Sequence, residues 1–174
     1  METLKDVGAP EVRPPDVNHA SLRQALSCFA TGVAIFTTLG DWDAPVGLTV
    51  NSFSSVSLDP PLVLWSLSLK APSFGAFQCH DGFAVNVMSA DAKDVVQRFA
   101  RPAPDKFAGL TWTSGFLGVP LLGDVVATFE CRTESRIAKG DHVIYLGQVE
   151  RYSKTERSPV VFHRGHFATL GDTL

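Results

Sequence analysis

Apolar and polar residues alternate in short runs along most of the chain, and the wider spacing of an amphipathic helix occurs only briefly. Runs rich in β-branched and aromatic residues predict strands. These predicted strands cover residues 33–38, 83–88, 125–137, 142–152, 160–163 and 166–170. Helical spacing predicts three short helices over 19–30, 73–79 and 91–99. Because strands mostly follow strands through short connections, the pattern favours a mainly β fold, an antiparallel barrel with a few short peripheral helices.

Capping and turn residues mark the ends of the predicted elements. Asn18 is placed to cap the first helix, and Asp91 is placed to cap the third. The Gly, Asp and Pro residues of 39–45 predict a hairpin loop, and residues 164–165 predict a tight turn. Residues 101–120 are predicted to form a long loop with a short strand at 111–112.

The stretch 47–70 carries more hydroxyl groups than a core strand needs. It is predicted as two neighbouring strands joined at residues 59–61. Val, Ile or Leu would normally fill such strand positions, so the pattern indicates a wall for a large polar ligand. A solvated sheet face is the alternative, and residue types alone favour it. The polar residues are Thr49, Asn51, Ser52, Ser54, Ser55, Ser57, Ser66 and Ser68.

Composition indicates one domain in a reducing compartment. Of the 174 residues, 1–17 are predicted as an N-terminal tail and 18–174 as the domain. The net charge of -3 and the pI of about 5.9 argue against a nucleic-acid binder. Neither a membrane span nor a secretory signal is predicted, since no apolar run is long enough. Three widely spaced cysteines without a CxxC pair are typical of a cytoplasmic protein.

The chain lacks the motifs of the commonest metal and catalytic sites. Its five histidines show neither HExxH nor a zinc spacing with cysteine, so no metal site is predicted. Gly-x-Ser-x-Gly, GxGxxG and GxxxxGK[ST] are also absent. A flavin, by contrast, is a planar heterocycle with a polyol chain and a phosphate, and neutral Ser, Thr and Asn groups match its polar edge. Hydride transfer through such a cofactor requires no nucleophile from the protein.

Five segments together carry a resemblance to a known family. They are TGVAIFTT (31–38), GLTVNSFSSVSLDPPLVLWSLS (47–68), FAVNVMS (83–89), GDHVIYLGQVE (140–150) and PVVFHRGHFATLG (159–171). Their order and spacing resemble the flavin reductase family with the FMN-binding split barrel. More narrowly, they resemble the short-chain NAD(P)H:flavin oxidoreductases that feed two-component monooxygenases. The resemblance implies a split β-barrel that reduces FMN or FAD with NADH or NADPH.

The resemblance also implies roles for individual residues. The histidine of the GDH turn, His142, is expected beside the nicotinamide as the catalytic side chain. Lys70 is expected near the flavin phosphate, with Arg98 as a further candidate. The remaining expected flavin contacts are Thr49, Val50, Asn51 and Ser52 along the ring, Ser54 and Ser55 toward the ribityl phosphate, Ser66, Leu67 and Ser68 at the other edge, and Phe83 and Ala84 on the next strand.

Members of this family are dimeric, so a homodimer is expected, with a monooxygenase as the partner that receives reduced flavin. Two alternatives stay open from the sequence. One is a non-catalytic flavin- or haem-binding split-barrel protein, and the other is a structural barrel whose serines are solvated. Retention of the GDH turn beside the full serine stretch favours the reductase, because storage alone needs no open nicotinamide face.

Overall fold

The computed structural model describes residues 18–171, and the predicted tail of 1–17 lies outside them. The strands are β1 Thr31–Gly32, β2 Ala34–Leu39, β3 Pro45–Val50, β4 Ser54–Leu58, β5 Pro61–Ser68, β6 Gly82–Met88, β7 Trp112–Ser114, β8 Pro120–Leu122, β9 Val125–Lys139, β10 His142–Lys154, β11 Val160–His163 and β12 His166–Thr169. The α-helices are α1 His19–Leu26, α2 Phe74–Cys79 and α3 Lys93–Phe99, with 3-10 turns η1 Asp41–Asp43, η2 Ala90–Ala92 and η3 Phe116–Gly118.

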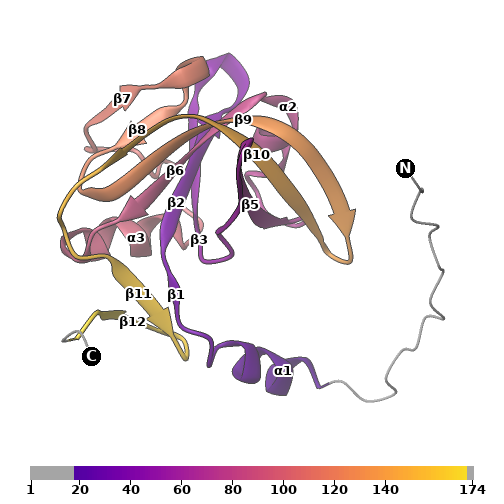
Figure 1. Cartoon of the computed structure of the whole chain (residues 1–174), viewed down its shortest axis with the longest axis vertical. Helices are drawn as coiled ribbons and strands as arrows, with labels where there is room; N and C mark the ends of the chain where they lie inside the picture. The colour runs from indigo at the N-terminus through magenta and orange to yellow at the C-terminus, as the bar shows by residue number, and fades with distance from the viewer. Residues whose placement is uncertain (1–17, 172–174) are drawn as a thin grey trace.

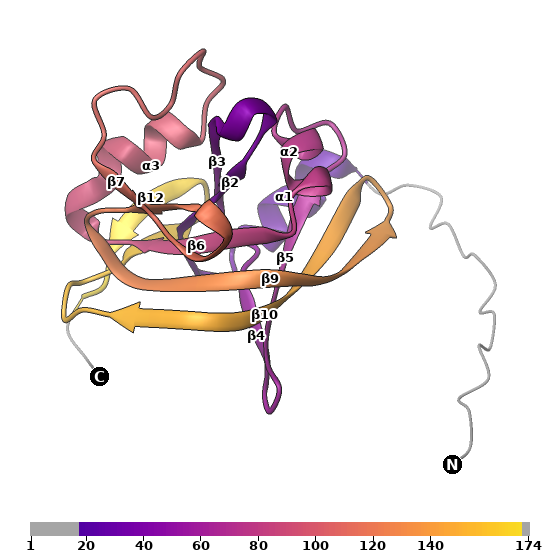
Figure 2. The same ribbon diagram turned by 90° about the horizontal axis from the view of Figure 1, so that it is seen from above.

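A curved sheet of seven strands forms the body of the molecule (Figure 1). Its strand order is β3-β2-β6-β9-β10-β5-β4, and every neighbouring pair is antiparallel. The long strands β9 and β10 cross the sheet, and α2 and α3 lie outside it (Figure 2). In a smaller three-stranded sheet β11 lies between β1 and β12, and β7 pairs with β8 in a two-stranded sheet. The predicted mainly β, antiparallel fold with short peripheral helices is confirmed.

The serine-rich stretch is organised differently from the prediction. The expected first strand is broken at residues 51–53, so its two parts, β3 and β4, lie at opposite ends of the sheet order. Phe53 packs against the core here, with its ring centroid 6.2 Å from Phe36 and 5.7 Å from Phe129. Burying this ring turns the chain away from β2. The prediction of one continuous strand before the prolines was therefore wrong.

Strand β2 is buried on both faces, which explains its continuous apolar run. Ala34 and Phe36 point into the barrel, where Trp65 stacks on Tyr145 with a centroid distance of 4.8 Å. Val33 and Ile35 belong to a second cluster with α3, which contributes Val96 and Phe99. Because side chains alternate between the two faces of this strand, one set contacts the barrel interior and the other contacts the layer that carries α3.

The helix ends agree only partly with the predicted caps. Asn18 caps α1 as predicted, since its Oδ1 accepts hydrogen bonds from Ala20 N at 2.9 Å and Ser21 N at 3.2 Å. The helix ends at Leu26, earlier than predicted. Asp91 does not cap α3, because η2 comes first and Ala92 occupies the N-cap position without a side-chain bond.

Substitution of Gly147 tests how closely the barrel interior is packed. An added Cβ would lie 2.3 Å from Cζ of Phe83, which is itself only 1% exposed and has no space to retreat. We expect Gly147→Ala to lower the free energy of unfolding by about 1–3 kcal/mol. Gly75→Ala, in α2 with nothing within 4 Å of the new Cβ, is the matched control and should be neutral or stabilising by up to about 1 kcal/mol. Urea unfolding of both variants measures the difference, and equal midpoints would contradict the packing described.

Candidate functional site

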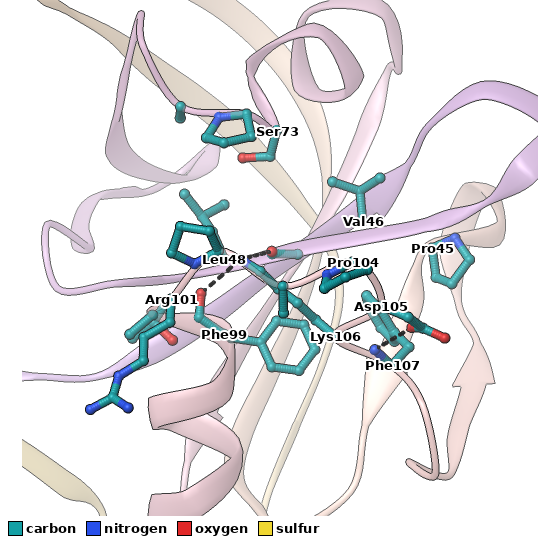
Figure 3. A pocket seen from close by; sticks show the side chains of 17 residues that line it. Pro45, Val46, Leu48, Ser73, Phe99, Arg101, Pro104, Asp105, Lys106 and Phe107 are labelled. Atoms are coloured by element: carbon teal, nitrogen blue, oxygen red, sulfur yellow. Dashed lines mark hydrogen bonds between the residues drawn. The ribbon is translucent and has the colours of Figure 1, made fainter.

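A cavity of about 500 Å³ lies along the free edge of β3 (Figure 3). Three segments far apart in the sequence form its wall. They are the edge strand from Pro45 to Thr49, the turn before α2 from Ala71 to Ser73, and the end of α3 with its following loop from Phe99 to Phe107. Apolar rings, a hydroxyl and a lysine therefore line one cavity.

The edge position of β3 gives the cavity its polar wall. Within the seven-stranded sheet β3 pairs only with β2, so backbone groups on its other side are open to a ligand. Gly47 allows α3 to approach this edge, since a Cβ there would lie 2.7 Å from Cε1 of Phe99. The sequence thus combines an unpaired strand edge with a closely packed aromatic floor.

Lys106 ties two of the three wall segments together, the edge strand and the end of α3 with its loop. Its Nζ donates to Phe99 O at 3.0 Å and to Gly47 O at 3.4 Å (Figure 3). Burial lowers the pKa of this ammonium group below its ordinary value. An ammonium group has three donors, so one remains for a ligand. Oδ1 of Asp105 accepts from Phe107 N at 2.8 Å and Ala108 N at 3.0 Å, which fixes the loop around Lys106.

Only one of the three predicted flavin contacts at residues 49–51 lines this cavity. Thr49 lines it, and its Oγ1 donates to Val96 O at 2.7 Å, so the hydroxyl holds α3 in place. Val50 and Asn51 continue along the strand into a smaller cavity of about 180 Å³ that also includes Thr49 and reaches Phe162 and Phe167. These predicted contacts of the flavin ring therefore lie beside one or both of the two cavities.

The predicted serines form a separate group on β4 and β5. The hydroxyl of Ser52 accepts from Ser66 N at 3.0 Å and donates to Ser66 O at 3.3 Å, which ties the break after β3 to β5. Ser66 and Ser68 are half-buried, whereas Ser54 and Ser55 are exposed. None of these five serines lines the β3 cavity.

Three other predicted contacts are buried in the protein. Leu67 and Phe83 are each 1% exposed and belong to the barrel core, and Ala84 is fully buried. Period-two alternation places Leu67 on the inner face of β5, opposite Ser66 and Ser68. Their side chains are therefore closed to a ligand, and the expected direct contact does not fit this structure. The motif resemblance did not show which side chains of these strands point into the barrel core and which point outward.

His142 begins β10 and lies across from Ser68. Its Nδ1 lies 2.7 Å from Oδ1 of Asp141, and hydrogen bonding to His142, followed by its charge, lowers the pKa of Asp141. Lys70 adds a smaller contribution in the same direction. Since Leu69 N donates to Asp141 O at 3.0 Å, the GDH turn is attached to the end of β5, just before the cavity wall begins at Ala71.

Sequence reasoning missed the part of the cavity supplied by loops. Ser73, Arg101 and Lys106 line it but were not expected there, and Arg98 instead donates to Ala108 O at 2.9 Å. The only available signal was the length of the loop after α3, because long loops on a rigid scaffold often carry function. Which loop residues face the cavity depends on tertiary packing.

Neither a metal-binding cluster nor a membrane-spanning helix occurs within residues 18–171. No group of three or more His, Cys, Asp or Glu side chains there is placed to hold a metal ion. No helix in the same range is long and apolar enough to cross a membrane.

Comparison with known proteins places the chain in a family. The sequence profile of the flavin reductase like domain matches residues 26–171. The chain belongs to the flavin reductase like domain family. This confirms the resemblance seen in the motifs, and the solved relatives have the same overall fold.

Three relatives show how far the similarity extends. The FMN reductase (NADH) SmoA of Agrobacterium fabrum is 41% identical, over 96% of this chain and 95% of its own length. The reductase component of the flavin-dependent trigonelline monooxygenase of Acinetobacter baylyi is 39% identical, over 85% of this chain and 48% of its own. The structure of the NADH:FAD oxidoreductase SgcE6 of Streptomyces globisporus, in complex with NAD and FAD fragments, has a TM-score of 0.84 and 34% identity, covering 88% of this chain and 93% of that one. The chain spans about half the length of the first curated relatives it matches.

Substitution of Lys106 tests its role in joining the cavity walls. Lys106→Met keeps the length of the side chain but leaves two backbone carbonyls without this donor. We expect the free energy of unfolding to fall by about 1–3 kcal/mol. Lys154→Met is the control, because the Lys154 side chain is 80% exposed, and it should be nearly neutral. Urea unfolding measures both, and a similar small effect for the two variants would show that the bonds of Lys106 contribute little.

Proposed function

We propose that the protein is an NAD(P)H:flavin oxidoreductase that supplies reduced flavin to a partner monooxygenase. The observation that carries this proposal is the cavity along the free edge of β3, which has the size and chemistry for a flavin in a chain of the flavin reductase family. Relatives described as an NADH-dependent FMN reductase and as the reductase component of a monooxygenase support it.

The residues of the cavity fit a flavin. Val46 and Leu48, which are half-buried, offer apolar surface for a planar ring, and the open edge of β3 offers backbone donors and acceptors for its polar edge. The Ser73 hydroxyl and the ammonium of Lys106 provide donors for a phosphate. Thr49, Val50 and Asn51 remain the proposed contacts at the ring end, and Lys70 remains a candidate cation because it directly precedes Ala71 in the wall.

Bound flavin supplies the redox chemistry, accepting a hydride from the reduced nicotinamide. The protein's part is to hold both partners in line and to exclude water. Lys106 fixes the loop and the strand edge against each other. His142, oriented by the carboxylate of Asp141, is proposed to contact the nicotinamide and to stabilise charge that develops during transfer. The serines Ser52, Ser54, Ser55, Ser66 and Ser68 are proposed to border the opening from the β4–β5 side.

The relatives narrow the choice of nucleotides. SmoA is described with FMN and NADH, and SgcE6 with FAD and NADH, so we propose NADH as the hydride donor and either flavin as the acceptor. A cytoplasmic location accords with these metabolites and with the free thiols of Cys28, Cys79 and Cys131.

A second copy of the chain is the proposed partner of α1. Leu22, Leu26 and Phe29 are 46%, 67% and 78% exposed, and no residue of α1 is buried. Figure 1 shows this helix beyond β1, away from the seven-stranded sheet. An apolar helix face left uncovered in this way is typical of an association surface, which supports the expected homodimer.

A spectrophotometric assay tests the proposed reaction. Purified protein is mixed with NADH or NADPH and with FMN or FAD, and loss of the reduced-nicotinamide absorbance is followed. We expect flavin-dependent oxidation by the wild type, and His142→Ala should lower kcat/KM for NADH by about 10- to 100-fold while the flavin Kd stays unchanged. His19→Ala, at the exposed start of α1, is the control.

The outcomes separate the open alternatives. No oxidation above the buffer rate with any pair of substrates would exclude the reductase. Bound yellow flavin without turnover would support the non-catalytic flavin-binding alternative instead. Normal turnover by His142→Ala would remove that residue from the site without affecting the rest of the proposal.

Light scattering coupled to size exclusion tests the homodimer. The wild type should have twice the chain mass of 18.8 kDa. Leu26→Ser combined with Phe29→Ser removes apolar surface from the proposed contact, so we expect the Kd of the dimer to rise by about tenfold or more. The exposed pair Lys154→Ser and Glu156→Ser serves as a control of equal size. A wild-type monomer at micromolar concentration would contradict the homodimer.

A further inference from the structure

A second cavity, of about 330 Å³, lies between α3 and the β11–β12 hairpin. Three side chains that carry or can carry positive charge line it, each from a different segment: Lys93 from α3, Arg101 from the loop after it, and His166 from β12. Gln97 adds an amide, and Ala100, Gly165 and Phe167 complete the wall. The lining includes no carboxylate, so we call it the cationic cavity.

These cations have no ion-pair partner in the described part of the chain. The salt bridges within residues 18–171 involve other residues, such as Arg132 with Glu150 and Arg157 with Asp124. Like-charged groups gathered at one cavity repel each other unless an anion lies between them. The arrangement therefore favours an anionic ligand over an apolar or cationic one.

The cationic cavity adjoins the β3 cavity. Ala100 and Arg101 line both, so the two spaces meet at the end of α3. In Figure 3 the Arg101 side chain extends away from Lys106, with its guanidinium outside the group of residues around that lysine. A ligand seated along β3 can therefore reach the cationic cavity past Ala100.

Local structure holds the two sides of this cavity in place. Lys93 and Gln97 are four residues apart on α3 and so share one face of the helix. Across from them, Arg164 and Gly165 have φ values of 49° and 83°, which make the tight turn that presents His166. The hairpin is anchored by a hydrogen bond from Arg164 N to Ser27 O at 2.8 Å and by the contact of Phe162 with Phe167.

We propose that the cationic cavity binds the pyrophosphate of a dinucleotide whose redox ring lies in the β3 cavity. A pyrophosphate offers several charged acceptor oxygens to ammonium, guanidinium and amide donors, and charge-assisted bonds of this kind are the strong ones. The proposal rests on the proposed function, because that function brings a dinucleotide to this site. NADH and FAD share this chemistry, and FMN lacks it.

Calorimetric binding to the full chain tests the assignment. The ligands are NAD⁺, FAD and FMN, and the variants are Lys93→Gln, Arg101→Gln and the two combined. For NAD⁺ or FAD we expect each substitution to raise Kd by about tenfold, and the effect to shrink as salt is added. For Lys93→Gln, which lies outside the β3 cavity, the Kd of FMN should change by less than about twofold, since one lost charge at a distance is screened in water. Lys154→Gln is the matched control, and unchanged urea midpoints confirm that the variants are folded.

Each outcome decides a different point. A weaker Kd for NAD⁺ alone assigns the cavity to the nicotinamide dinucleotide, and a weaker Kd for FAD without a change for FMN assigns it to the flavin dinucleotide. Unchanged affinities for NAD⁺ and FAD overturn the proposal, as does an equal loss for FMN in Lys93→Gln, which would indicate a single phosphate. Turnover of NADH by the wild type is measured in parallel. The proposed reductase activity can therefore be confirmed even when the proposal for the cationic cavity is overturned.

Discussion

The candidate site depends on one unpaired strand edge. Because the chain breaks at residues 51–53, β3 stays at the end of the sheet with one side open. The turn before α2 and the end of α3 enclose that side without pairing to it. Lys106 stabilises the arrangement by donating to carbonyls of both β3 and α3. An eighth strand pairing with this edge would occupy the space of the cavity, so the cavity exists because the sheet is left incomplete.

Charge is distributed unevenly around this edge. Neutral hydroxyls and amides belong to β3 itself and its continuation, and Lys106 reaches this strand from the loop after α3. The cations Lys93, Arg101 and His166 line the separate cationic cavity. A neutral wall suits a ring that changes its charge during reduction, because a fixed charge in contact would favour one redox state. A cationic end suits phosphates, whose charge stays the same throughout. The geometry thus separates the part of a ligand that reacts from the part that anchors it.

Much of the fold could be predicted from alternation, since β6, β9, β10, β11 and β12 follow the expected ranges closely. The break before β4 was missed, although the apolar spacing changes from two to three between Val50 and Phe53. Phe53 packs against Phe36 and Phe129 at this break. At the site, Thr49 lies on a cavity wall, and its contact with a flavin ring stays a prediction. Lys106 and Arg101 were not predicted there, because a loop without periodicity gives no signal for which side chains turn inward.

The separation of β3 from β4 also bears on synthesis of the chain. The β4–β5 hairpin is complete early, yet its partner in the sheet is β10, where His142 pairs with Ser68 and Gln148 with Leu62. Such distant pairing slows folding and leaves strands unpaired in the meantime. During synthesis on the ribosome, the edge of β5 that pairs with β10 therefore stays unpaired until most of the chain has emerged. The hydroxyls of Ser66 and Ser68 make part of this unpaired strand polar, which reduces its tendency to aggregate.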